Sequence, residues 1–111
     1  MKKRIFIVVF AIIAVSSITY SYISRGDLSA SWHLIDVNYG RLQGDANLLI
    51  IGNTIVMIDA GYSHEARTKV VPYLQNMGIA KIDHFFISHP HRDHYEGLAA
   101  IIDSGIPITN L

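Results

Sequence analysis

A short segment at residues 88–94 constrains the fold of this sequence more than any other feature. It reads Ser-His-Pro-His-Arg-Asp-His and contains four potential metal ligands, His89, His91, Asp93 and His94. The three histidines come directly after an apolar run over residues 82–88. Such a run is typical of a strand buried on both faces. Open α/β folds place their sites at the carboxyl ends of strands. The sequence therefore predicts an α/β fold with a metal site at the end of this strand.

The spacing of the four side chains suits two metal ions. His89 and His91 are two residues apart in extended backbone, so they point the same way and can share one ion. Asp93 and His94 lie at the turn into the next helix and can reach a second ion. The sequence has no cysteine, so any metal must be held by His, Asp or Glu, and disulfides and thiol nucleophiles are excluded. We expect the remaining histidines to pack or to face solvent: His33, His64 and His84.

The surrounding sequence predicts strands alternating with helices. Gly52-Asn53 separates apolar runs at 46–51 and 54–59, which favours a tight hairpin with positive φ. Ser63 is a candidate N-cap for a helix that ends near Gly78, and Pro72 either kinks this helix or starts a fresh turn. The other predicted elements are a strand at 32–37, a loop at 38–45, a helix at 98–104 and the start of a strand at 106–111.

The N-terminus has the pattern of a targeting segment. Three basic residues, at positions 2–4, precede residues 5–24, which carry no charge. The length fits either a signal peptide or an uncleaved anchor in a membrane. We therefore divide the chain into a signal or anchor (1–24), a linker (25–31) and a domain (32–111). Either reading predicts export, to the periplasm, the extracellular space or the outer side of the cytoplasmic membrane.

Length and charge restrict the remaining possibilities. A chain of 111 residues allows one modest domain. Without residues 1–23, six basic side chains face nine acidic ones, so composition does not support a basic surface for nucleic acid. The sequence carries no signal for a particular oligomeric state.

Four segments of the chain together resemble the N-terminal half of the metallo-β-lactamase-fold hydrolases. They are Ile-Asp-Val at 35–37, Gln-Gly-Asp-Ala at 43–46, Ile-Asp-Ala-Gly at 58–61 and the segment at 88–94, which matches the family's HxHxDH signature in full. Within the superfamily the chain looks most like the exported hydrolase domain of competence-type DNA-uptake proteins and their stand-alone relatives. In those relatives the first two segments are contiguous, whereas residues 38–42 separate them here.

The resemblance implies an αββα sandwich, of which residues 32–111 supply the N-terminal half. It implies two zinc ions, with manganese or iron as alternatives, and a bridging hydroxide as nucleophile. His89 and His91 would bind the first ion, and Asp93 and His94 the second, with Asp93 also expected to serve catalysis. Asp59 would orient the ligands from beside the metal loop, the alternative being a simple turn carboxylate at the end of its strand.

The predicted metal sites are incomplete. Catalytic zinc commonly takes three protein ligands, and the motif supplies two to each ion, whereas the family adds ligands further downstream. We therefore expect a part of a longer hydrolase, acting on a small-molecule or phosphoester substrate. One alternative is another activity of the same fold, a thioesterase of the glyoxalase type or a lactamase. The other is a non-catalytic, membrane-tethered metal-binding remnant, or a half-domain completed by a partner.

Overall fold

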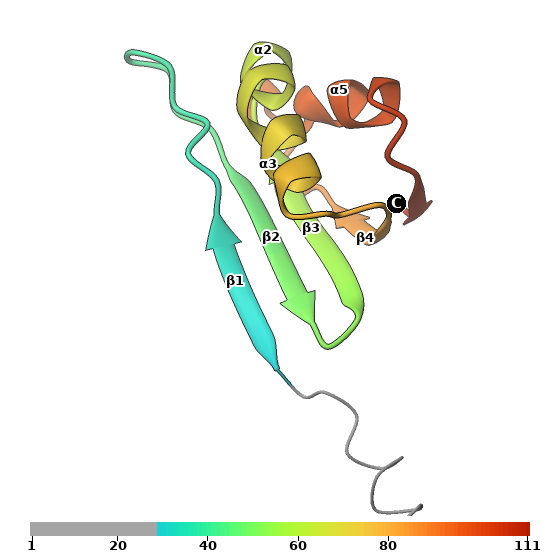
Figure 1. The fold of residues 1–111 in the computed structure, drawn as a ribbon. Helices are drawn as coiled ribbons and strands as arrows, with labels where there is room; N and C mark the ends of the chain where they lie inside the picture. Colours follow the sequence, from blue (N-terminus) through green and yellow to red (C-terminus); the bar gives the residue numbers. More distant parts are fainter. Residues whose placement is uncertain (1–28) are drawn as a thin grey trace, which may run out of the picture.

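A computed structural model describes residues 29–111, which form one five-stranded sheet in the order β1-β2-β3-β4-β5 with helices on it (Figure 1). The strands are β1 (Ala30–Leu34), β2 (Ala46–Ile51), β3 (Thr54–Ala60), β4 (Ile82–Phe86) and β5 (Ile108–Asn110). The helices are α2 (Ser63–Glu65), the π-helical η1 (Ala66–Val70), α3 (Val71–Asn76), α4 (Arg92–Tyr95) and α5 (Gly97–Asp103). The predicted α/β class is confirmed for this part of the chain.

The predicted signal or anchor at 1–24 lies outside the described residues. The same holds for most of the predicted linker. Within residues 29–111, none of the helices has the length and apolar character needed to span a bilayer.

The hairpin predicted at Gly52-Asn53 is confirmed. β2 and β3 pair antiparallel, and the pair Ile51↔Thr54 closes the two-residue turn. Gly52 adopts φ +57°, a conformation that glycine enters without the steric penalty of a side chain. The turn residues therefore set the register of the two central strands.

β3 and β4 run parallel, and the connection between them passes through α2, η1 and α3. In the register of this pair, Ile58 lies opposite Phe86. Parallel strands end at the same edge of a sheet, so the residues that follow Ile58 and Phe86 meet there. This crossover is what brings Asp59 next to the histidine-rich segment.

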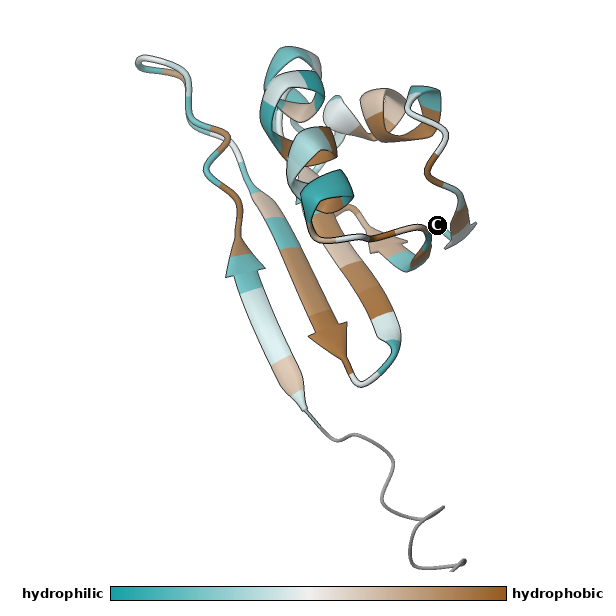
Figure 2. Ribbon diagram, in the orientation of Figure 1, coloured by the Kyte–Doolittle hydropathy of each residue, from teal (hydrophilic) through white to brown (hydrophobic). Residues whose placement is uncertain are grey.

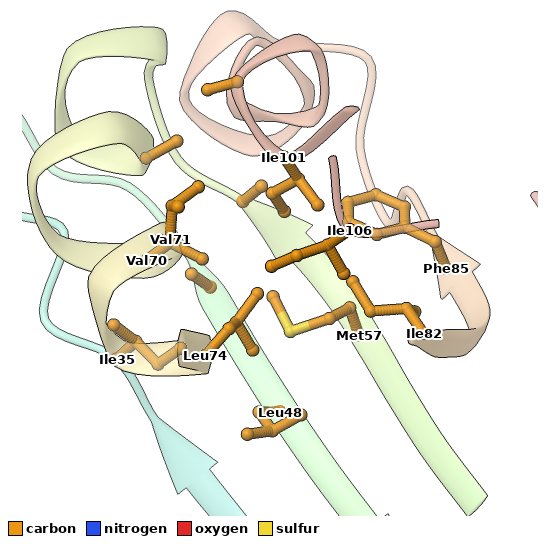
Figure 3. Packing of buried hydrophobic residues seen from close by; sticks show 14 of the residues in the cluster. Ile35, Leu48, Met57, Val70, Val71, Leu74, Ile82, Phe85, Ile101 and Ile106 are labelled. Carbon is orange, nitrogen blue, oxygen red and sulfur yellow. The ribbon is translucent and has the colours of Figure 1, made fainter. Parts of the chain in front are cut away.

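The helices and the sheet enclose one hydrophobic core. Leu48 of β2 and Met57 of β3 are fully buried under Leu74 of α3 and Ile101 of α5, and Figure 3 shows these side chains gathered between the layers. Figure 2 shows β2 and β3 as strongly hydrophobic strands, as expected for the centre of a sheet. Burial of this face is the main driving force that holds the helices on the sheet.

The opposite face of the sheet is apolar and open. The strand register aligns Trp32, Leu49, Val56 and His84 in one row across four strands. Trp32 remains 68% exposed, because the described helices pack on the other face. For the same reason the prediction that the strand at 82–88 is buried on both faces is wrong: the strand ends at Phe86, which is 55% exposed.

The bounds of the first strand differ from the prediction. The first strand covers Ala30–Leu34 instead of 32–37. Its ladder with β2 runs from Ala30↔Ile51 to Leu34↔Asn47, and beyond it only one backbone hydrogen bond, from Ile35 to Ala46, continues the contact. Ile35 and Val37 leave the strand but are buried in the core, which explains their apolar character. The pattern at 32–37 therefore predicted a strand with the wrong bounds, and of its large apolar residues Trp32 and Leu34 are exposed.

The first helical region resolves the question of Pro72. Tyr62 takes the N-cap position in place of Ser63, and it makes no side-chain capping hydrogen bond. Pro72 lies in the first turn of α3, directly after the π-helical η1, and Val70 before it is also helical, so the helical backbone continues through Pro72 by way of a π-helical segment instead of starting afresh. Gly78, at φ +71°, follows the end of α3 as predicted.

Gly97 marks the closest approach between a helix and the sheet. A Cβ atom at this position would lie 2.2 Å from the carbonyl oxygen of Ala60 and 2.7 Å from Cβ of Ala66. The backbone amide of Gly97 also donates a hydrogen bond of 2.8 Å to the carbonyl of Gly61. Glycine is therefore required at the start of α5 for steric reasons.

We predict that Gly97→Ala destabilises the fold by about 3 kcal/mol, because the added methyl group must push α5 away from β3. Gly105→Ala is the matched control: its Cβ would meet nothing within 4 Å, and its φ of +83° costs about 1 kcal/mol of backbone strain. Urea unfolding of both variants measures the difference. Equal losses would contradict the close contact at Gly97.

Candidate metal centre

The predicted metal ligands lie where the carboxyl ends of β3 and β4 meet the start of α4. His91 is the N-cap of α4 and has extended backbone, with φ −95° and ψ 152°. Asp93 and His94 lie in the helix itself. The predicted turn into a helix is therefore confirmed, whereas residues 89–91 form a bend instead of a straight extended stretch.

Asp59 forms the buried base of this arrangement. Its side chain is 2% exposed, and its carboxylate accepts hydrogen bonds from the backbone amide of Ser88 at 2.8 Å and from the Ser88 hydroxyl. Asp59 adopts φ +62°, which aspartate tolerates better than most side chains. These contacts hold the end of β3 to the start of the histidine-rich segment.

His94 is oriented by the same carboxylate. Its Nδ1 lies 2.9 Å from Oδ2 of Asp59, so Nδ1–H donates and Nε2 is left with its lone pair. The hydrogen bond to Asp59 raises the pKa of His94, the charges of Asp59, Asp93 and Asp45 add to this effect, and burial opposes it. Nε2 lies 3.6 Å from Oδ2 of Asp93. Two ligands of one tetrahedral zinc ion are roughly 3.4 Å apart, so these two atoms fit a shared ion.

His89 and His91 form the second pair of donors. Their Nε2 and Nδ1 atoms share a hydrogen bond of 2.8 Å, and the two rings are perpendicular with centroids 4.2 Å apart. Two imidazole nitrogens on one zinc ion are separated by roughly 3.3 Å, so a small movement of the rings would admit an ion. The pair therefore has the donor chemistry and the approximate spacing that zinc requires.

The two pairs are adjacent, because the rings of His89 and His94 have centroids 5.2 Å apart. Within residues 29–111, no group of three or more His, Cys, Asp or Glu side chains is arranged to hold one metal ion. Each pair thus supplies two donors, fewer than the three protein ligands of catalytic zinc sites.

The other histidines make contacts elsewhere. His33 hydrogen-bonds to the hydroxyl of Tyr73 at 2.8 Å, and His84 stacks on Phe86. His64 packs edge-on against Tyr39. The structure therefore keeps these three side chains apart from the metal loop.

The loop before β2 reaches the site, which sequence reasoning did not foresee. The backbone amide of Asp45 donates to the carbonyl of Asp93 at 3.2 Å, and Oδ2 of Asp45 lies 3.7 Å from Nδ1 of His94. A groove of about 290 Å³ runs along residues 34–38 and 44–47 and includes Asp45 in its lining. The Gln-Gly-Asp-Ala stretch was the available signal, but the pattern alone predicted only a turn between strands.

A family model described as the metallo-beta-lactamase superfamily matches residues 39–108, which is more than half of the chain. No curated protein and no solved structure matches the chain.

We predict that Asp59→Asn destabilises the metal-free protein by about 2 kcal/mol, because Asn keeps the shape but loses the charged acceptor. The pKa of His94 falls in this variant, which ring-proton NMR titration measures. Because folding raises the pKa of His94, the pair of His94 and Asp59 stabilises the fold most at pH below the ordinary histidine pKa of 6.5. This contribution to stability is lost as pH rises through the pKa of the folded state.

Asp103→Asn is the control for this experiment. It breaks an ion pair with Arg67 in which both side chains are more than half exposed, so it costs less than about 0.5 kcal/mol. An unchanged His94 pKa in Asp59→Asn would contradict the assigned contact.

Proposed function

Because the chain belongs to the metallo-beta-lactamase superfamily, we propose that it supplies half of a zinc-dependent hydrolase site that cleaves ester-type substrates. The mixed α/β fold with its five-stranded sheet fits a half-domain of that superfamily. The observation that carries the proposal is the hydrogen bond from His94 to Asp59, since it directs Nε2 of His94 toward Asp93 and away from the core.

Four side chains of the chain would hold the metal. His89 Nε2 and His91 Nδ1 would share one zinc ion, and the Asp93 carboxylate and His94 Nε2 a second, with manganese or iron as alternative metals. When bound, zinc acts as a Lewis acid and makes hydroxide available near neutral pH. Asp93 would act in catalysis by accepting a hydrogen bond from the attacking water, which orients it toward the substrate.

Asp59 and Ser88 support this chemistry without touching the substrate. Asp59 keeps the proton on Nδ1 of His94, so that Nε2 remains an acceptor. Ser88 satisfies the other carboxylate oxygen through its backbone amide. These hydrogen bonds fix the direction of the buried carboxylate.

The missing donors would come from outside the described residues. Each pair needs at least one further ligand to reach the number found in catalytic zinc sites. We propose that a further segment of the protein supplies them, and completion by a partner chain is the alternative. A non-catalytic remnant that binds one metal weakly is the outcome if neither exists.

For the substrate we propose a phosphodiester. The support is the resemblance of the Gln-Gly-Asp-Ala and Ser-His-Pro-His segments to exported, competence-type hydrolases, together with the N-terminal segment that predicts export. Arg92 provides a cation beside the metal loop, although it is engaged by Glu96 at 2.7 Å. In this proposal the protein works on the outer side of the cytoplasmic membrane, anchored there or released.

One observation favours a second candidate, hydrolysis of an uncharged thioester or lactam. The groove beside the site is lined by the carboxylate residues Asp36 and Asp45 and by no basic residue. Two negative charges disfavour a phosphate in the groove and accept a neutral or cationic group there.

We predict that the 111-residue chain binds zinc weakly, with a dissociation constant in roughly the micromolar range or above. Structural sites with four protein ligands bind zinc with a free energy of about 10–16 kcal/mol, and each pair here supplies only two ligands. His91→Ala removes most of this affinity, and the control His84→Ala leaves it unchanged. Competition with a chelating dye measures both. Equal affinity in the two variants would refute the assignment of His91.

We also predict that the 111-residue chain with added zinc does not hydrolyse a bis-aryl phosphodiester, since each metal pair lacks a ligand. A protein that carries the missing donors should hydrolyse it, and the same assay with a thioester and a β-lactam separates the two candidate functions. Phosphodiester turnover by the 111-residue chain would overturn the half-site proposal.

A further inference from the structure

We propose that Asp45 is a positioning residue for Asp93 and His94. This inference rests on the proposed function, because it assigns Asp45 a role toward two predicted metal ligands. Asp45 is not itself placed as a ligand: its carboxylate lies near Nδ1 of His94, whereas Nε2 is the nitrogen that faces Asp93.

The backbone of Asp45 connects separate parts of the site. Its amide donates to the carbonyl of Asp93 at 3.2 Å, and its own carbonyl accepts from the amide of Gly61 at 2.8 Å. The carbonyl of Gly61 in turn accepts from the amide of Gly97 at 2.8 Å. These bonds tie the loop before β2 to the end of β3 and to the helices that carry the predicted ligands.

The chain beside Asp45 is packed closely enough to transmit its position. A Cβ atom at Gly44 would lie 3.0 Å from the carbonyl oxygen of Asp93 and 3.3 Å from Cγ2 of Val37. Val37 is 1% exposed and therefore cannot move aside without disturbing the core. The absence of a side chain at Gly44 lets the loop approach the metal segment.

The far side of the loop is also anchored. Lys69 donates from Nζ to the carbonyl of Asn38 at 2.7 Å, and the Asn38 side chain accepts from the amide of Gly44 at 3.4 Å. Asp36 accepts a hydrogen bond of 3.0 Å from the amide of Asn38. The loop is thus held at both ends, which gives Asp45 a defined place beside His94.

The Asp45 carboxylate adds a second negative charge near Nδ1 of His94. Its Oδ2 lies 3.7 Å from Nδ1, compared with 2.9 Å for Oδ2 of Asp59. The Asp45 side chain is 59% exposed, so its charge acts more weakly than that of buried Asp59. Both charges favour the tautomer with the proton on Nδ1, which leaves Nε2 free for a metal. We therefore expect Asp45 to have a smaller effect than Asp59 on the fraction of His94 that carries its proton on Nδ1.

Two measurements on the 111-residue chain test this role. In the metal-free protein, ring ¹⁵N chemical shifts report the fraction of His94 with the proton on Nδ1. In the presence of Co²⁺, the d–d absorption of the ion reports metal affinity. We expect Asp45→Ala to lower the Nδ1–H fraction and to weaken Co²⁺ binding roughly tenfold, the lower end of the effect of groups that orient metal ligands. Asp45→Asn keeps the backbone contacts but removes the negative charge, so it should show how much of the change in Nδ1–H fraction and Co²⁺ affinity is due to that charge.

Asp103→Ala is the matched control, since it removes a carboxylate that is 59% exposed, as that of Asp45 is, and whose ion pair is with Arg67 instead of His94. We expect its Nδ1–H fraction and Co²⁺ affinity to stay within twofold of the parent chain. Thermal unfolding by circular dichroism verifies that each variant is folded at the assay temperature. Equal losses in Asp103→Ala and Asp45→Ala would overturn the proposal, because they would show a general effect of removing an exposed carboxylate.

The outcomes separate this inference from the proposed function. If the parent chain binds no Co²⁺, the proposed metal function fails, and the ring ¹⁵N shifts of the metal-free protein still decide the role of Asp45. If the parent binds Co²⁺ and Asp45→Ala changes neither affinity nor ring shifts, the positioning role is wrong and the metal function stands. If Asp45→Ala does not fold, Asp45→Asn decides by the same two measurements.

Discussion

The buried carboxylate of Asp59 is the interaction on which the arrangement of the site depends. It lies at the end of β3 and receives hydrogen bonds from Ser88 and His94, which follow β4. Burial of a charge is costly unless it is paired and hydrogen-bonded, so the carboxylate holds these partners in place. Loss of either partner would remove part of the hydrogen bonding of a carboxylate that is only 2% exposed, which is costly. The direction of His94 is therefore coupled to the stability of the fold.

Close backbone contacts then bring a third segment to the same place. Gly97 lets α5 touch the end of β3, and Gly44 lets the loop before β2 touch the carbonyl of Asp93. Neither contact leaves room for a Cβ atom without displacement of a neighbour. Asp45 reaches His94 only because these contacts exist. Three parts of the chain thus meet at the site through close backbone contacts, which a side chain at Gly44 or Gly97 would prevent.

Local chemistry explains which predictions are confirmed. The turn at Gly52 and the end of α3 before Gly78 need positive φ, a requirement that glycine meets wherever the surrounding chain lies. The length of β1 and the exposure of Phe86 depend instead on which strands and helices pack nearby. The sequence pattern therefore predicted a strand at 32–37 but not its end, and Ile35 and Val37 lie beyond it in the core. The same pattern could not reveal that one face of the sheet is open.

The sequence by itself determined the donor chemistry and the local backbone of the candidate site. The HxHxDH segment contains the four predicted ligands, and the turn into a helix at its end was predicted from the local sequence. Only the tertiary structure decided which groups surround them. Parallel pairing of β3 with β4 placed Asp59 at Nδ1 of His94, and backbone hydrogen bonds placed Asp45 beside it. The reason is physical: spacing within a segment is set by local backbone geometry, whereas contacts between distant segments form only when the core packs.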